Sequence, residues 1–212
     1  MGRIKNGILG GFSGKVGAVV GASWRGIDYI RALPSISTKP ASKAQLAQRA
    51  KMILLRGFLL GMDEIIERCF QNLIKHTPMN DALSYNILNS VEGSYPDQTI
   101  NFNNLLYSKG DLTGAWSPKV NSVQSNSIDF TWDHGIFHPM CAAEDEVIVV
   151  VYDPVKMKFC RLENAAIRSE KALRLIVPPT FKGNSVHCYI SFYSKSRNIA
   201  STSEYLGTVK VQ

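Results

Sequence analysis

Short segments that alternate apolar and polar residues fill the sequence after Gly93. Turn residues such as Asp153-Pro154 and Lys182-Gly183-Asn184 separate these segments. Because successive side chains of a strand point to opposite faces, a period of two predicts β-strands. Strands so closely spaced are typical of an antiparallel sandwich, and the last six or seven would complete one immunoglobulin-like or fibronectin-type-III-like domain with Trp132 in its core. We expect strands at 100–102, 105–107, 128–132, 147–152, 157–162, 172–177, 186–193 and 205–211.

Before Gly93 the apolar residues recur at helical spacing instead. Residues 34–40 are typical of a linker, because prolines flank serine and threonine. Residues 42–45 form a capping box, which predicts a helix that starts there and ends before Pro78. A second helix is expected from residue 80 or 81 to about Ser90. Two glycines lie on the apolar face of the first helix, where either a neighbouring backbone approaches closely or the helix breaks: Gly57 and Gly61.

Positive charge is concentrated at the N-terminal end of the chain. The net charge is +7, and the first 56 residues hold ten Lys or Arg but a single acid, Asp28, so the remainder is mildly acidic. This basic segment also contains Phe12, Trp24 and Tyr29, a combination that could contact phosphates and stack on bases. An anionic partner protein would explain the same charge. No helix-turn-helix, zinc-finger or RNA-recognition signature accompanies it.

The segment 14–26, GKVGAVVGASWRG, is rich in glycine, low in charge and prone to form β-structure. We expect two short strands, at about 16–20 and 23–31, with a turn near Gly21 or Gly26. Exposed strand edges offer unpaired backbone groups to other chains. Such a strand can be covered by the chain's own sandwich, or it can be added to a sheet of a neighbouring subunit.

Candidate catalytic, phosphate-binding and metal-binding motifs in this sequence match the known patterns poorly. Residues 144–146, Glu-Asp-Glu, are expected to form a solvated acidic turn that protects the next apolar strand from aggregation. The run from Gly7 to Lys15 lacks the P-loop order, because Val16 follows the lysine. Four residues of types that can bind metals lie close together in the sequence, but their spacing matches no zinc-binding pattern: Asp133, His134, His138 and Cys141. We therefore expect no catalytic residue, no cofactor, no metal and no small-molecule substrate.

The four cysteines have no Cys-x-x-Cys spacing, which indicates free thiols in a reducing compartment, although a disulfide between two strands stays compatible with it. Cys69 lies on the apolar helix face, where a packing role is expected. Lys15 and several glycines interrupt the apolar N-terminal segment, so we expect no cleaved signal peptide. No segment reaches the roughly 20 apolar residues that a membrane-spanning helix needs.

Specific motifs of the N-terminus, Gly14-Lys15-Val16-Gly17, Trp24-Arg25-Gly26 and Tyr29-Ile30-Arg31, resemble the opening of an uncharacterised protein family from Bacteroidota. Residues 39–49 and 203–211 are similar to the same family. Its members have no assigned activity, so the resemblance implies only an origin and a cytoplasmic or phage-like context. The Gly-Lys-Val-Gly strand followed by a Pro-Ala-x-x-Ala-Gln helix start is also similar to small structural proteins of phages.

These patterns together predict an α+β chain with a Gly-rich basic β-arm at 1–34, a linker and helical segment at 35–93, and a β-sandwich at 94–212. We expect a non-enzymatic, homo-oligomeric structural protein that forms a ring or filament by adding strands of its arm to a neighbour. The alternative is an accessory protein that binds nucleic acid. Trp24, Tyr29 and Ile30 are the expected buried anchors, and cations of the arm would meet the acidic remainder of the next subunit. The expected interface comprises Lys15, Val16, Val19, Val20, Trp24, Arg25, Tyr29, Ile30 and Arg31.

Overall fold

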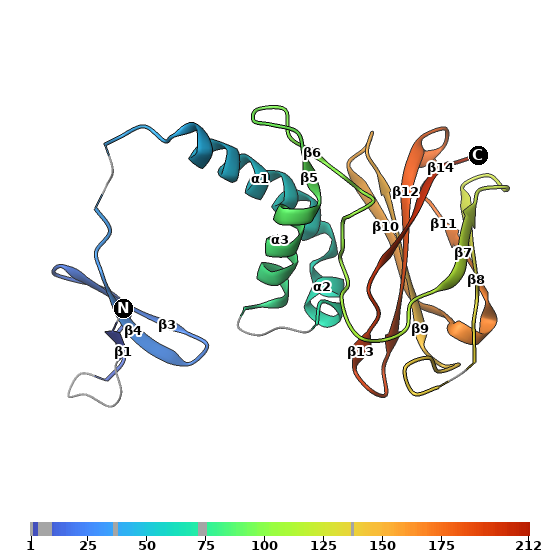
Figure 1. Ribbon diagram of the computed structural model, residues 1–212, viewed down its shortest axis with the longest axis horizontal. Helices are drawn as coiled ribbons and strands as arrows, with labels where there is room; N and C mark the ends of the chain where they lie inside the picture. Colours follow the sequence, from blue (N-terminus) through green and yellow to red (C-terminus); the bar gives the residue numbers. More distant parts are fainter. Residues whose placement is uncertain (1, 4–9, 36–37, 72–75, 137) are drawn as a thin grey trace. The chain divides into compact units, whose positions relative to one another are not determined.

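The computed structural model describes residues 2–3, 10–35, 38–71, 76–136 and 138–212 (Figure 1). Parts of the N-terminal signature and of the run compared with a P-loop fall on residues 4–9, outside the described residues. The chain forms two compact units, Met1–Ser42 and Lys43–Gln212.

The first unit is a small antiparallel sheet with the strand order β1-β4-β3-β2. Positive φ angles at Arg25 (51°) and Gly26 (75°) produce a two-residue turn of the kind that closes β-hairpins. The turn thus lies at Gly26, one of the two expected positions. The prediction of one strand at 23–31 is wrong, because this turn divides that segment between β3 and β4. The strands are β1 (Gly2–Arg3), β2 (Gly14–Val16), β3 (Val19–Trp24) and β4 (Ile27–Ala32).

Helices follow in the second unit. The first begins at Lys43, directly after Ser42, as the capping box predicts. The helix expected up to Pro78 is broken near Gly61, the alternative left open by the sequence. A Cβ at Gly61 would lie 2.5 Å from the Phe159 ring, so glycine leaves room for this ring. An aromatic ring, not a backbone, approaches this glycine. The elements are α1 (Lys43–Leu59), the 3-10 turn η1 (Leu60–Met62), α2 (Asp63–Cys69) and α3 (Pro78–Asn89).

The second unit ends in an antiparallel β-sandwich, which confirms the predicted α+β fold class. One sheet has the order β11-β8-β7; in the other, β10-β9-β12 continues to β14, and β13 also pairs with β12. This arrangement is of the immunoglobulin-like or fibronectin-type-III-like kind. The strands are β7 (Trp116–Asn121), β8 (Ser127–Asp133), β9 (Glu146–Asp153), β10 (Lys158–Ile167), β11 (Ala172–Ile176), β12 (Ser185–Ser194), β13 (Ile199–Ala200) and β14 (Glu204–Lys210).

A few short elements differ from the sequence prediction. Residues 105–107 form no strand; Leu105 and Tyr107 are buried in a loop that contributes to the helix-side core. Strand β7 was not predicted, because Pro118 and its polar neighbours hide the alternation. The remaining elements are β5 (Val91–Glu92), which pairs with β6 (Thr99–Ile100), and the 3-10 turns η2 (Arg168–Glu170) and η3 (Pro179–Phe181).

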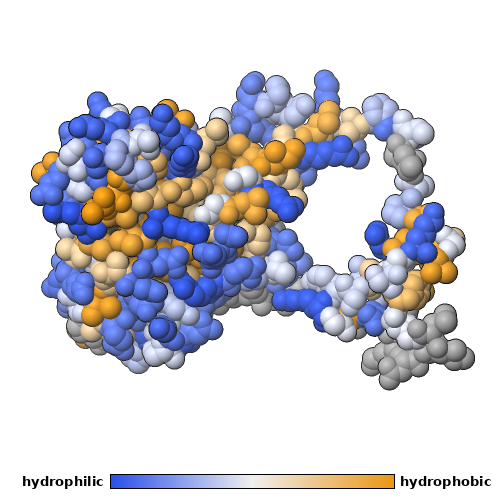
Figure 2. Space-filling model, turned by 180° about the vertical axis from the view of Figure 1, so that it is seen from behind, coloured by the Kyte–Doolittle hydropathy of each residue, from blue (hydrophilic) through white to orange (hydrophobic). Residues whose placement is uncertain are grey.

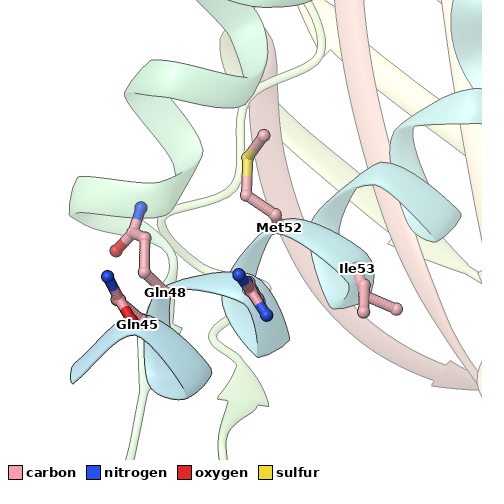
Figure 3. Close-up of a pocket in the computed structure, with 5 residues that line it drawn as sticks. Gln45, Gln48, Met52 and Ile53 are labelled. Carbon is pink, nitrogen blue, oxygen red and sulfur yellow. The ribbon is translucent and has the colours of Figure 1, made fainter. Parts of the chain in front are cut away.

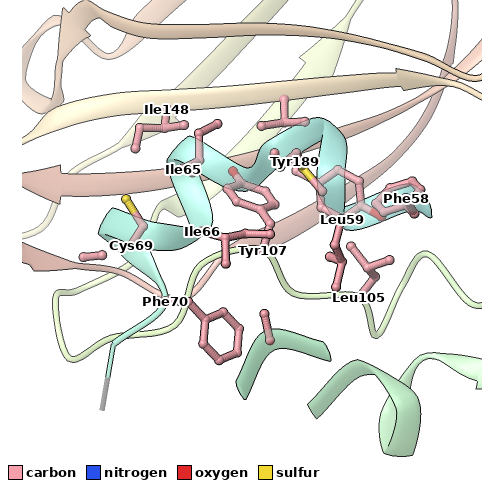
Figure 4. Close-up of a cluster of buried hydrophobic side chains, with 14 of the residues drawn as sticks. Phe58, Leu59, Ile65, Ile66, Cys69, Phe70, Leu105, Tyr107, Ile148 and Tyr189 are labelled. Carbon is pink, nitrogen blue, oxygen red and sulfur yellow. The ribbon is translucent and has the colours of Figure 1, made fainter. Parts of the chain in front are cut away.

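Two hydrophobic clusters lie within Lys43–Gln212, one between the two sheets and one between the helices and the β9-β12 sheet. Strand β9 contributes side chains to both hydrophobic clusters. Val149 faces the sandwich core, where Trp132 is buried as predicted, whereas Ile148 and Val150 contact the helices (Figure 4). A strand buried on both faces is apolar throughout rather than alternating. Because both clusters are complete without the first unit, we expect the second unit to fold without it.

Candidate assembly interface

The described residues of the first unit form no hydrophobic core of their own. Among the described residues of Met1–Ser42, Gly21 alone is buried, and neither hydrophobic cluster includes a residue of this unit. Val16 is 60% exposed and Trp24 is 48% exposed, and Figure 2 shows apolar side chains of this unit at the surface. Small sheets need a buried hydrophobic face or a helix packed on them to be stable. The described residues of this unit therefore supply no buried hydrophobic layer for the sheet.

One face of the arm is apolar. Residues that are paired in antiparallel register lie on the same face, and the faces alternate along each strand. Val16 pairs with Val19, Val19 with Ala32, and Gly21 with Ile30. Phe12 covers this face, since its ring would lie 2.5 Å from a Cβ at Gly21. We call this surface the apolar face; it comprises Phe12, Val16, Val19, Ile30 and Ala32.

Asp28 shares the apolar face, because it pairs with Ser23, two residues beyond Gly21 on the same strand. The Asp28 carboxylate lies against Gly11, where a Cβ would collide with it. The residues Gly11 and Phe12 therefore cross this face closely, and a larger residue at position 11 would displace the Asp28 carboxylate.

The opposite face of the arm carries its positive charge. The register places Lys15 opposite Val20, Val20 opposite Arg31, and Ala22 opposite Tyr29. Trp24 lies on the same face, and the guanidinium of Arg25, in the adjoining turn, is 5.3 Å from the centroid of the Trp24 ring, at cation–π distance. We call this surface the basic face; it comprises Lys15, Val20, Trp24, Tyr29 and Arg31.

The nine residues expected at the interface are thus divided between two faces rather than gathered on one. Three lie on the apolar face (Val16, Val19 and Ile30), five make up the basic face, and Arg25 lies in the turn. The expected anchors Trp24, Tyr29 and Ile30 are exposed or half-buried within the single chain. Sequence reasoning did not place Asp28 on the apolar face, because it left open whether the chain turns near Gly21 or Gly26 and so did not fix the strand register. It also did not place Phe12 there, since Phe12 reaches this face from outside the paired strands. Recognition of the turn at Arg25 and Gly26 would have given the register.

The arm also has an open edge. Strand β2 ends the strand order, and no strand in the described part of the chain pairs with its outer side. Val16 and Val19 flank a two-residue turn and form a hydrogen-bonded pair, so the next pair, Lys15 and Val20, does not exchange backbone hydrogen bonds. The N–H and C=O of Lys15 therefore point away from β3, toward the open edge.

Three edge strands of the sandwich, β7, β10 and β14, in contrast carry features that discourage strand addition. The β10 pairing is irregular between Glu163 and Ile167, and the β7 pairing between Trp116 and Lys119. The β14 pairing shifts register beside Tyr189. Such irregularities bend a strand and leave residues unpaired. The edge of β2 has no comparable irregularity.

The acidic turn at 144–146 was predicted to be solvated, which is wrong for Asp145. Its carboxylate is fully buried and lies 3.2 Å from Arg168 Nε and 2.9 Å from Arg197 Nη2. Burial lowers the pKa of the Arg168 guanidinium, which also donates to the carbonyl oxygens of Thr113 and Gly114 and lies over the Phe192 ring. The sequence gives no sign of this pair, because Arg168 lies 23 positions away.

Candidate metal ligands are not gathered into a site. His138 and Cys141 exchange backbone hydrogen bonds, and Cys141 is buried. Within the described residues, no three His, Cys, Asp or Glu side chains are arranged to hold a metal ion.

All four cysteines are free thiols, and Cys69 packs in the helix-side core as predicted. No helix in the described part of the chain is long and apolar enough to cross a membrane.

Comparisons with known proteins bear on the family. Comparison with curated proteins finds no match. Among solved structures, the chain is similar to the FN1-FN3 domains of chicken CNTN1, with 11% identity over 49% of this chain and a TM-score of 0.31. The similarity covers 34% of that chain. Residues 11–207 match the profile of a family of unknown function. Since this match extends over nearly the whole sequence, the chain belongs to the family of unknown function DUF6266.

Proposed function

We propose that this chain is a non-enzymatic structural protein that assembles with copies of itself into a ring or filament through its N-terminal arm. The observation that carries the proposal is the arm's sheet, which buries no hydrophobic side chain among its described residues. A sheet of this kind is stabilised when another chain supplies the missing contacts. The cytoplasmic or phage-like setting and the Bacteroidota origin implied by the sequence resemblance are part of the same proposal.

In the proposed contact, the open edge of β2 pairs with a strand of a neighbouring copy. The outward N–H and C=O of Lys15 would form the central backbone hydrogen bonds of this pairing. Cations on the basic face and Arg25 would then approach the mildly acidic remainder of the neighbour. Because the donating and accepting surfaces differ, the contact is heterologous and builds a closed ring or an open filament.

Solution mass tests the proposal. The full-length chain and a chain that begins at Ser35 are compared by sedimentation velocity at about 0.1 M and about 1 M salt, where charge interactions between exposed groups are strongly screened. We expect a large assembly that survives high salt for the full chain, and a monomer for the shortened one. Equal association of both chains, or a full-length monomer in every condition, would contradict the proposal.

A substitution at Lys15 tests the strand edge separately. Lys15→Pro removes the outward N–H without breaking the β2–β3 hydrogen bonds, and proline is tolerated on edge strands. Lys15→Ala removes the charge but keeps the N–H. We expect Lys15→Pro to weaken assembly by about tenfold, equivalent to about 1.4 kcal/mol, and Lys15→Ala to have little effect at high salt. Equal losses would indicate that charge, and not strand pairing, holds the copies together.

A second candidate is binding of single-stranded nucleic acid. The observation that favours it is the basic face, where Lys15 and Arg31 share a surface with Trp24 and Tyr29. Cations beside exposed aromatic rings are the usual means of contacting phosphates and stacking bases. Affinity for an oligonucleotide should then fall steeply as salt rises. An oligonucleotide that fails to bind even at low salt would eliminate this candidate.

A further inference from the structure

Helices α1 and α3 carry an open apolar groove. A depression of about 490 Å³ on α1 continues into a second one of about 310 Å³ between α1 and α3, with Gln48 and Met52 common to both (Figure 3). Ile53 is 74% exposed and Leu88 is 81% exposed. We call this surface the helical groove; it comprises Gln48, Met52, Ile53, Leu83, Ile87 and Leu88.

The first three turns of α1 are only partly covered by the rest of their unit. Within the described residues, α1 has no buried side chain before Leu55. Helices shorter than about 12–15 residues are marginal in water unless an apolar face is packed. Exposed apolar side chains on such a segment indicate a surface that another element covers.

Charge limits what can cover the groove. Helix α1 contains four Lys or Arg and no acid, and Arg49 lines the depression beside Met52 and Ile53. Another basic surface, including α1 of a second copy, would place like charges together. The occupant must therefore be apolar and either uncharged or acidic on the side it presents.

We infer that the helical groove binds the apolar face of the arm of a second copy, which rests on the arm-mediated assembly proposed above. Val16, Val19 and Ile30 supply exposed or half-buried apolar side chains on a face where the described strand residues include no lysine or arginine. The same face holds Asp28, the single acid of the first 56 residues, which complements Arg49. One contact would thereby cover exposed apolar side chains of both surfaces, including Val16 of the arm and Ile53 and Leu88 of the helical groove.

The connection between the arm and α1 is short. The arm ends at Ala32 and α1 begins at Lys43, and the segment between them contains Pro34 and Pro40. Proline restricts the backbone and favours extended conformations. Exchange of an element between identical subunits across a short connection is a low-cost route to assembly.

Mixing two forms of the chain tests where the arm binds. A chain that begins at Ser35 keeps the groove and both hydrophobic clusters but has no arm, so it should bind full-length chains and shorten their assemblies. The same shortened chain with Ile53→Asp should bind about tenfold more weakly or not at all. A matched control is Val123→Asp, because Val123 is 76% exposed on the sandwich, and it should bind like the parent.

Charge exchange provides an independent readout. Arg49→Glu in the full-length chain should weaken assembly by repelling Asp28, and Asp28→Arg added to it should restore part of the loss. The inference is overturned if shortened chains fail to bind full-length ones, or if Ile53→Asp and Val123→Asp behave alike. Assembly that still requires the arm but ignores Ile53→Asp would leave the proposed function intact and remove only this inference. A full-length chain that stays monomeric would overturn both.

Discussion

Asp145 and Arg168 are both fully buried, and each satisfies the other's charge. Removal of one partner leaves the other charge buried without compensation, which costs roughly 3–5 kcal/mol. We therefore expect Asp145→Ala to lower the free energy of unfolding by about that amount, measured by urea denaturation. Arg197→Ala is the control, since its side chain is 26% exposed and can be replaced by water. Similar losses from the two substitutions would contradict a buried ion pair centred on Arg168.

His187 should make stability depend on pH. Its ring stacks on Phe102, with centroids 3.8 Å apart, and its Nδ1 lies 2.8 Å from the Tyr205 hydroxyl. Burial lowers the pKa of His187 below its ordinary value of 6.5. The unfolded chain therefore binds more protons between the two pKa values, and the stabilising contribution, present above pH 6.5, is lost as pH falls through that range.

The measurement is the urea midpoint of the shortened chain between about pH 7.5 and pH 5. His187→Phe keeps a stacked ring but cannot be protonated, so its midpoint should fall less over the same range. Identical slopes for the two proteins would show that other groups, such as carboxylates, cause the pH dependence.

Thiol reactivity should separate Cys160 from the other cysteines. Cys69, Cys141 and Cys188 are buried, and burial raises the pKa of Cys188 to about 12. Cys160 is only partly buried, although its pKa is raised too. Since the thiolate is the reactive form, we expect one slowly reacting thiol in the folded protein and all four after denaturation, counted with a chromogenic disulfide reagent. Rapid reaction of a second thiol would show that the core opens locally.

At the scale of elements, two glycines near the end of α1 provide a matched pair. A Cβ at Gly61 would meet the Phe159 ring at 2.5 Å, whereas a Cβ at Gly57 meets nothing within 4 Å. Gly61→Ala should destabilise the protein by about 1–3 kcal/mol through overpacking. Gly57→Ala should stabilise it by up to about 1 kcal/mol, because alanine favours the helix interior. Thermal unfolding of both variants checks the prediction, and shifts of the same sign would contradict the close approach of Phe159.

Most elements of the sandwich could be predicted from the sequence. Strands β8, β9, β11 and β12 follow the expected segments closely, because the alternation of side chains is a local property of extended backbone. The break of the helix near Gly61 was an open alternative, and the approach of Phe159 to this glycine could not be predicted, because Phe159 lies nearly a hundred residues away. The turn was expected near Gly21 or Gly26, and it lies at Arg25 and Gly26, where a non-glycine residue also adopts positive φ.

At the scale of the whole molecule, the two units should be independent in stability. Both hydrophobic clusters belong to Lys43–Gln212, so the chain that begins at Ser35 should unfold cooperatively, with a midpoint close to that of dissociated full-length chain. Calorimetry at low protein concentration measures both. A shortened chain that is molten or aggregated would show that the arm contributes to the core of its own subunit.

The local sequence pattern was sufficient to predict most sandwich strands, the start of α1 after Ser42 and the concentration of positive charge near the N-terminus. Each of these features depends on residues that are neighbours in the sequence. Three features needed the tertiary structure: the packing of the helices on β9, the burial of Asp145 with Arg168, and the separation of the arm into an apolar and a basic face. Each arises from residues distant in sequence or from the register between strands. The free energy of such contacts depends on which surfaces meet, and periodicity along the chain carries no information about that.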